Sequence, residues 1–206
     1  MSDLTLSPEQ TACIFIEYQN EFTTEGGKLY PATKEVMEKT SMRENSVKLI
    51  EFCREKGILV LHCPIAFEPG HREISKVPYG ILQGIKDGKA FERGDSGSDY
   101  YEPMKPIEGE LVVKGKSGLC SFASTNLEFL LHQHGIKNVV LSGFLTNCCV
   151  ESTMRTAYEK GFKVYTLKDC TAATSLAAHE ASFEHNFGMF SVPTTSEEIK
   201  KAISVE

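Results

Sequence analysis

The order of apolar and amphipathic segments is the feature that most constrains the fold of this chain. Short apolar runs, rich in aliphatic and β-branched residues, alternate with longer stretches of helical spacing. Runs of this kind are typical of strands buried on both faces. Strands that alternate with helices connect through right-handed crossovers. The pattern predicts an α/β fold with three αβα layers and a mostly parallel central sheet, its strands at residues 12–16, 58–62, 110–114, 138–142 and 163–167.

Three of the intervening stretches carry an apolar stripe and end at a glycine, as helices commonly do. The glycines are Gly57, Gly135 and Gly161. The spacing Thr125-x-x-Glu128 predicts a capping box at the start of the second helix. The stripes are Met42, Leu49, Ile50 and Cys53; Leu127, Leu130, Leu131 and His134; and Val150, Met154, Ala157 and Tyr158.

Length and composition favour one domain that spans residues 1–206. The chain has 206 residues, of which 41% are hydrophobic, enough for one sizeable core and too few for two full domains. No linker, repeat or low-complexity segment interrupts the pattern. We therefore expect a single hydrophobic core around the sheet.

Charge and cysteine content restrict the partners and the compartment. A net charge of −6 argues against nucleic acid or an anionic membrane as a partner. The N-terminus resembles neither a secretory signal nor a transit peptide, and no apolar run approaches the roughly 20 residues of a membrane span. The seven cysteines lack CxxC spacing, which favours free thiols in a reducing compartment and predicts a cytoplasmic protein.

Chemically useful residues follow three of the predicted strands. Glu17 follows the first, Lys114 and Lys116 lie at the end of the third, and Cys148 and Cys149 follow the fourth. Ligands of parallel sheets bind at the carboxyl ends of the strands. A thiol at a helix N-terminus is expected to have a lowered pKa, and the amides there can hold an oxyanion. An acid, a cation and a thiol are thus predicted at one edge of the sheet.

Three segments resemble the motifs of the isochorismatase-like cysteine hydrolases, in the order of that family. Residues 16–22 resemble an Asp-x-Gln-x-x-Phe motif after a strand, with Glu17 in place of the aspartate. Residues 116–122 look like the Lys-x5-Phe segment, and residues 143–150 look like the Gly-x-x-Thr-x-x-Cys-Val loop that carries the nucleophile. The similarity runs across nearly the whole chain and implies the family's αβα fold.

The resemblance implies a role for each matching residue. Counting from Thr146 places the nucleophile at Cys149 rather than Cys148, and counting back from Phe122 places the lysine at Lys116 rather than Lys114. A catalytic triad of Glu17, Lys116 and Cys149 follows.

In the implied mechanism, Glu17 takes the thiol proton, Lys116 stabilises the anionic pair, and the sulfur attacks a carbonyl. The backbone amides of Leu145 and Cys149 would form the oxyanion hole, next to a non-proline cis peptide between Phe144 and Leu145. Glu17 has one methylene more than the usual aspartate, which keeps the carboxylate but lengthens its arm.

A nucleophilic cysteine implies C–N hydrolysis of a small amide, ureide or carbamoyl compound rather than the vinyl ether hydrolysis of isochorismate. Phe22 and Phe122 are predicted to line the substrate pocket, with Tyr79 contributed by the glycine-rich segment 68–101. The family commonly forms dimers or tetramers, so a homo-oligomer is expected.

Other chemistries are less consistent with the sequence. Residues 109–117 resemble a phosphate-binding loop, but five residues separate Gly109 from Gly115 where that loop has four. The six histidines lack metal-ligand spacing, so structural or surface roles are expected, with no metal and no cofactor. Two alternatives stay open: a non-catalytic binding protein of the same fold, and a thiol redox protein that uses Cys148 and Cys149, although a disulfide between adjacent residues is strained.

Overall fold

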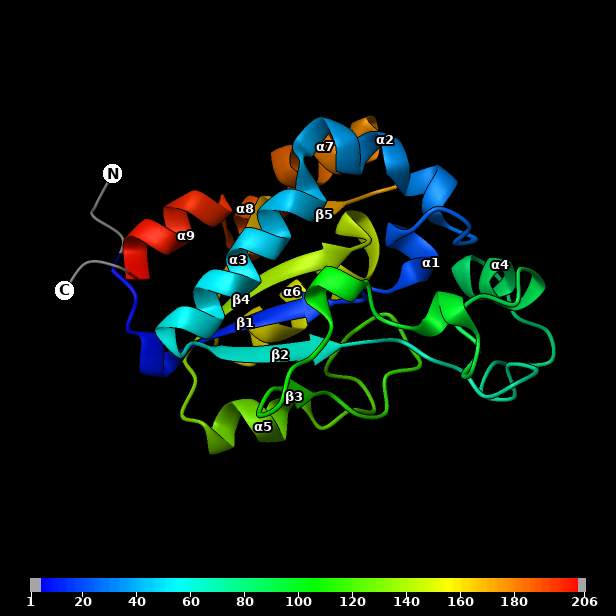
Figure 1. Cartoon of the computed structure of the whole chain (residues 1–206), viewed down its shortest axis with the longest axis horizontal. Helices are drawn as coiled ribbons and strands as arrows, with labels where there is room; N and C mark the ends of the chain where they lie inside the picture. The colour runs from blue at the N-terminus through cyan, green and yellow to red at the C-terminus, as the bar shows by residue number, and fades with distance from the viewer. Residues whose placement is uncertain (1–4, 204–206) are drawn as a thin grey trace.

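A six-stranded parallel sheet forms the centre of the computed structural model, which describes residues 5–203 (Figure 1). The strand order is β3-β2-β1-β4-β5-β6, and every pair is parallel. The predicted αβα class with a mostly parallel sheet is therefore confirmed. The strands are β1 (Thr11–Ile16), β2 (Leu59–Cys63), β3 (Leu111–Val112), β4 (Asn138–Phe144), β5 (Lys163–Ala172) and β6 (Val192–Thr194).

Helices cover both faces of the sheet. The helices are α1 (Asn20–Thr23), α2 (Tyr30–Thr40), α3 (Met42–Lys56), α4 (Ile81–Asp87), α5 (Leu127–Gln133), α6 (Glu151–Glu159), α7 (Leu176–Ala181), α8 (Gly188–Phe190) and α9 (Ser196–Ile203). In β1, Cys13 and Phe15 join the core beneath α2, α3 and α9, whereas Ile14 and Ile16 join the core beneath α5 and α6. Alternate residues of one strand thus serve two cores, because successive side chains point to opposite faces.

The three striped segments form α3, α5 and α6, but several elements lie outside the predicted set. The edge strand β6 has only three residues, and β5 continues to Ala172 beyond the predicted end at Leu167. Strand β3 shrinks to Leu111–Val112, so Lys114 lies beyond its end. Short edge strands and a strand bent by a register shift leave little periodic signal in the sequence.

The predicted capping box at the start of α5 is wrong. The helix begins at Leu127, and the Thr125 hydroxyl accepts a hydrogen bond from the Leu127 amide at 3.1 Å. The N-cap is Asn126, without a side-chain cap hydrogen bond, and Glu128 pairs with Lys160 at 2.7 Å. A tertiary ion pair therefore takes the carboxylate that the local motif would have used.

The topology selects one place on the carboxyl edge of the sheet. Chain order reverses between β1 and β4, which lie side by side although β2 and β3 intervene in the sequence. Ligand sites of open parallel sheets occur at such switch points. In Figure 1 the arrowheads of β2 and β4 point towards the side where α1 lies and where the long segment with α4 extends.

No helix within residues 5–203 is both long enough and apolar enough to cross a membrane.

Candidate active site

Three residues from distant parts of the chain meet at this switch point. Glu17 follows β1, Lys116 follows β3, and Cys149 lies in the π-helical turn η4 (Thr146–Val150) that links β4 to α6. Their exposed fractions are 2%, 2% and 4%. The Lys116 ammonium donates to a Glu17 carboxylate oxygen and, at 2.8 Å, to the carbonyl of Gly118. The predicted acid, cation and thiol therefore lie together, nearly shielded from water.

Lys116 carries a positive charge despite its burial. Burial by itself would lower the pKa of this lysine, but the Glu17 carboxylate and the Cys149 sulfur outweigh it and raise the pKa above its usual value. Buried charges persist where a partner compensates the loss of water. The ammonium is thus a fixed positive charge beside the sulfur.

The expected lowering of the pKa of Cys149 is wrong. A hydrogen bond with the Cys148 thiol, burial and the Glu17 carboxylate raise the pKa of Cys149 well above its usual range, and Lys116 opposes them. The positive end of a helix dipole acts weakly in comparison with burial and a neighbouring carboxylate. The resting sulfur is therefore a thiol, and an attack on a carbonyl needs a base for its proton.

The loop that carries the sulfur, residues 143–150, is called the nucleophile loop below. It begins where β4 and β5 shift in register, at Gly143 with φ +119°. A Cβ on Gly143 would lie 1.9 Å from the carbonyl oxygen of Ile16, so only glycine fits there. The next peptide, Phe144–Leu145, is cis, as predicted. The Leu145 carbonyl then accepts the amides of Cys148 (3.0 Å) and Val150 (3.2 Å).

The first motif supplies both an acid and a structural amide. Glu17 has φ +57°, a left-handed conformation that is uncommon outside glycine, and its amide donates to the Cys63 carbonyl at 3.1 Å. The Gln19 side chain exchanges hydrogen bonds with both backbone groups of Ile65 and donates to the carbonyl of Ser98. Gln19 thereby joins the ends of β1 and β2 to the long segment over the sheet edge.

The aromatic residues predicted to contact substrate have different surroundings. Phe22 is buried and stacks on Phe144 with ring centroids 4.9 Å apart. Phe122 is buried in the core that also contains Cys149. Tyr79 is 90% exposed. Phe22 and Phe122 thus belong to the two cores that meet at the nucleophile loop, whereas Tyr79 lies on the surface.

The histidines do not form a ligand cluster. His62 bonds to Glu110, and His71 lies between the Ala90 carbonyl and Glu92. Within residues 5–203, no group of three or more His, Cys, Asp or Glu side chains has a geometry that could hold a metal ion.

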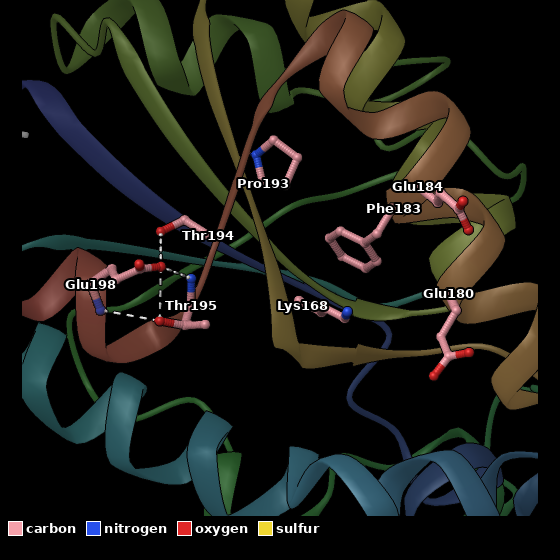
Figure 2. Close-up of a pocket in the computed structure, with 8 residues that line it drawn as sticks. All are labelled: Lys168, Glu180, Phe183, Glu184, Pro193, Thr194, Thr195 and Glu198. Carbon is pink, nitrogen blue, oxygen red and sulfur yellow. Dashed lines mark hydrogen bonds between the residues drawn. The ribbon is translucent and has the colours of Figure 1, made fainter. Parts of the chain in front are cut away.

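A hollow of about 530 Å³ opens elsewhere, between β6, the start of α9 and the α7 region (Figure 2). The Glu198 carboxylate lies at the start of α9, where it accepts hydrogen bonds from the amide and the hydroxyl of Thr195. None of the three residues at the switch point lines this hollow, whose lining consists of Lys168, Glu180, Phe183, Glu184, Pro193, Thr194, Thr195 and Glu198.

One contact at the active site lay outside the sequence predictions. The Thr146 hydroxyl and His179 Nδ1 are 2.9 Å apart, and both residues are buried. In the sequence, Thr146 was used only to align the nucleophile motif. His179 lies 33 residues away and belongs to no motif. Sequence spacing contains no signal for such a pair.

The chain matches the family model described as the isochorismatase domain over residues 11–198. Ureidoacrylate amidohydrolase of Acinetobacter baylyi is 28% identical over 191 residues, which cover 87% of this chain and 78% of that protein. Maleamate amidohydrolase of Pseudomonas putida is 28% identical over 172 residues, with 83% and 76% covered.

Solved structures agree with these matches. An isochorismatase-like hydrolase from Alkaliphilus metalliredigens superposes with a TM-score of 0.78 at 27% identity, covering 94% of this chain and 98% of that one. N-carbamoylsarcosine amidase from Thermoplasma acidophilum shares the fold, with a TM-score of 0.72 at 24% identity and coverage of 91% and 97%.

Proposed function

This chain belongs to the isochorismatase family, and we propose from that premise that Cys149 is the nucleophile of its amidohydrolase reaction. The protein hydrolyses a non-peptide C–N bond of a small amide, ureide or carbamoyl compound, the reaction class shared by its named amidohydrolase relatives. Glu17 acts as the general acid and base, and Lys116 stabilises the negative charge that develops on Glu17 and the sulfur.

The first half of the reaction forms a thioester. Glu17 accepts the proton of the Cys149 thiol while the sulfur attacks the substrate carbonyl. The amides of Leu145 and Cys149 bind the oxyanion of the tetrahedral intermediate. Glu17 then gives the proton to the departing nitrogen, so that ammonia or an amine leaves and the acyl group stays on the sulfur.

The second half returns the free enzyme. Water takes the place of the amine, and Glu17 accepts one of its protons as its oxygen attacks the thioester. Collapse of the second intermediate breaks the C–S bond, releases the acid and returns the proton to sulfur. The balance is one water consumed and one C–N bond cleaved, with no change of oxidation state.

The observation that carries this proposal is the meeting of Glu17, Lys116 and Cys149 in a nearly dry site. Burying an ion pair is costly, and an apolar pair of similar volume is often as stable. The raised pKa of Cys149 also explains why a base must stand beside it. The longer arm of Glu17 meets Lys116, so the glutamate is compatible with the triad.

The proposal also covers the pocket, the domain and the assembly. Phe22 and Phe122 are proposed to shape the pocket from the two cores, and Tyr79 to close over substrate from the long segment. We propose that residues 1–206 act as one domain and assemble as a homodimer or homotetramer, which the exposed side chains Phe129, Tyr158 and Met189 favour. Seven unpaired cysteines favour the cytoplasm.

A release assay tests the function directly. The purified protein is incubated with a panel of small amides, ureides and carbamoyl compounds, and both ammonia and carboxylate are measured. We expect stoichiometric release for at least one compound and a trapped acyl adduct on Cys149 by mass spectrometry. Turnover of the same compound by Cys149→Ala would refute the thioester mechanism. Light scattering of the same sample measures the oligomeric state.

A further inference from the structure

A buried histidine touches the nucleophile loop from outside the triad. His179 lies in α7 and is 1% exposed. Its Nδ1 lies 2.9 Å from the hydroxyl of Thr146, which is itself fully buried. Within residues 5–203, this is the one side-chain hydrogen bond that joins the nucleophile loop to another element. This hydrogen bond therefore couples the position of α7 to the loop.

The other ring nitrogen shows that packing alone does not account for this residue. His179 Nε2 is buried and makes no hydrogen bond of good geometry within residues 5–203, although the backbone of Lys168 lies close enough to the ring to raise its pKa. A buried polar atom without a partner costs free energy, and such atoms are rare in folded proteins. The ring packs near Phe183 with centroids 5.1 Å apart, so an apolar side chain would suit the same surroundings. The contact of Nδ1 with Thr146 is what a purely apolar residue would lose.

The imidazole adds no net charge to the active site. Burial, followed by the nearby Lys168 ammonium, lowers the pKa of His179. A neutral imidazole has one donor and one acceptor nitrogen, and the Thr146 hydroxyl can complement either one. The hydrogen bond therefore forms with either tautomer, and it leaves the charges of Glu17 and Lys116 unchanged.

Thr146 is well placed to control the reacting groups. It follows Leu145 and precedes Cys149 by three residues, so the sulfur and both proposed oxyanion amides lie within four positions of it. Catalytic geometry tolerates little error, since displacements of about 1 Å cost roughly a hundredfold in rate. Ser175 caps the start of α7 by accepting the amide of Ala178 at 3.2 Å, and Glu180 of the same helix lines the hollow in Figure 2.

We propose that His179 is a positioning residue that holds the nucleophile loop through Thr146, so that Cys149 and the oxyanion amides keep their reactive geometry. The inference rests on the proposed function in that Cys149 is the nucleophile. It assigns His179 no contact with substrate and no proton transfer in the reaction.

The test compares variants that keep or remove this hydrogen bond. Thr146→Val removes the hydroxyl and preserves the shape, whereas Thr146→Ser keeps the hydroxyl. His179→Asn places an amide where Nδ1 lies and can donate or accept, whereas His179→Gln extends its amide towards the position of Nε2. Each variant is measured for kcat, KM, thermal unfolding and the rate at which iodoacetamide alkylates Cys149, identified by fragment-ion mass spectrometry.

We expect Thr146→Val and His179→Gln to lose about ten- to a hundredfold in kcat, the range for an uncompensated buried hydrogen bond, with KM within about twofold. Cys149 alkylation should slow in the same variants. Thr146→Ser and His179→Asn should stay within about threefold of the parent protein. The double variant Thr146→Val/His179→Gln should be no slower than the worse single variant, because both remove one contact.

Three results would overturn the inference: unchanged kcat in folded Thr146→Val, equal losses in His179→Asn and His179→Gln, or additive losses in the double variant. Failure of the proposed function gives a different pattern. If Cys149 is not the nucleophile, Cys149→Ala retains turnover, whereas the alkylation rates across the series still report whether His179 positions the loop.

Discussion

Two acid–cation clusters, one buried at the switch point and one partly buried before β3, differ in the hydrogen bonds that their carboxylates accept. The Glu110 carboxylate accepts hydrogen bonds from both Nε (2.7 Å) and Nη2 (3.1 Å) of Arg54. The same carboxylate receives the Ile107 amide at 3.0 Å and contacts His62 Nε2 at 2.8 Å. Within residues 5–203, the Glu17 carboxylate accepts a hydrogen bond from Lys116 alone, and it lies beside the Cys149 thiol.

The hydrogen bonds to Glu110 determine how it ionises. Burial would raise the pKa of Glu110, but Arg54, the Ile107 amide and His62 outweigh it and lower the pKa to about 2. A carboxylate with this many donors is a poor base, because a proton would have to displace them. Glu110 therefore fastens α3 to the segment before β3. Glu17 lies beside Cys149 and has Lys116 as its side-chain partner, which is the placement that the proposed general base needs.

Removal of the Cys149 sulfur should cause the largest loss of activity predicted at either cluster. Cys149→Ala should lower kcat/KM by at least about a thousandfold, because the covalent path is lost. Cys148→Ala is the matched control and should retain turnover within about tenfold, since the adjacent sulfur forms no covalent bond to substrate. Ammonia release measures both. Equal losses in the two variants would contradict the assignment of the nucleophile to Cys149.

Neutralising Glu17 should separate turnover from thiol ionisation. In Glu17→Gln we expect kcat to fall about a hundred- to ten-thousandfold through loss of the general base. The pKa of Cys149 should fall, because a negative charge that raises it is gone while Lys116 remains. Alkylation of Cys149 at pH 7 should therefore become faster as hydrolysis becomes slower. Slower alkylation in the folded variant would show that Glu17 does not oppose the thiolate.

The same substitution in the other cluster should affect stability instead. Glu110→Gln should lower the free energy of unfolding by about 1–3 kcal/mol, because charge-assisted hydrogen bonds are lost in a partly buried site. Its kcat/KM should stay within about threefold at 25 °C. Urea unfolding and ammonia release measure the two quantities. A large loss of turnover at full stability would place Glu110 in the active site.

A smaller effect is expected from acid. The pKa of Glu110 is about 2 in the fold and about 4.5 for an unperturbed glutamate, so the unfolded chain binds this proton first as the pH falls. The stability contributed by Glu110 is thus fully present above about pH 4.5 and is lost as the pH falls towards 2. The difference in urea midpoint between the parent protein and Glu110→Gln should shrink across this window. A constant difference would contradict the lowered pKa.

Much of the fold could be predicted because its signals are local. Strands buried on both faces have continuous apolar runs, and α3, α5 and α6 have regular stripes that end at glycine. The family motifs also predicted that Glu17, Lys116 and Cys149 lie close together. The elements that escaped prediction, such as β6 and the end of β5, are short or irregular, and tertiary contacts define them. The capping box failed because Lys160, 32 residues away, binds Glu128.

The sequence by itself therefore determined the layer architecture, the residues of the proposed triad and the glycine-containing loop that carries Cys149, since all of these depend on residue type and spacing along the chain. Only the tertiary structure decided the protonation of Cys149, the contrast between Glu17 and Glu110, and the contact between His179 and Thr146. Burial and the approach of charges from distant segments set these properties, and neither quantity is encoded in any one stretch of residues.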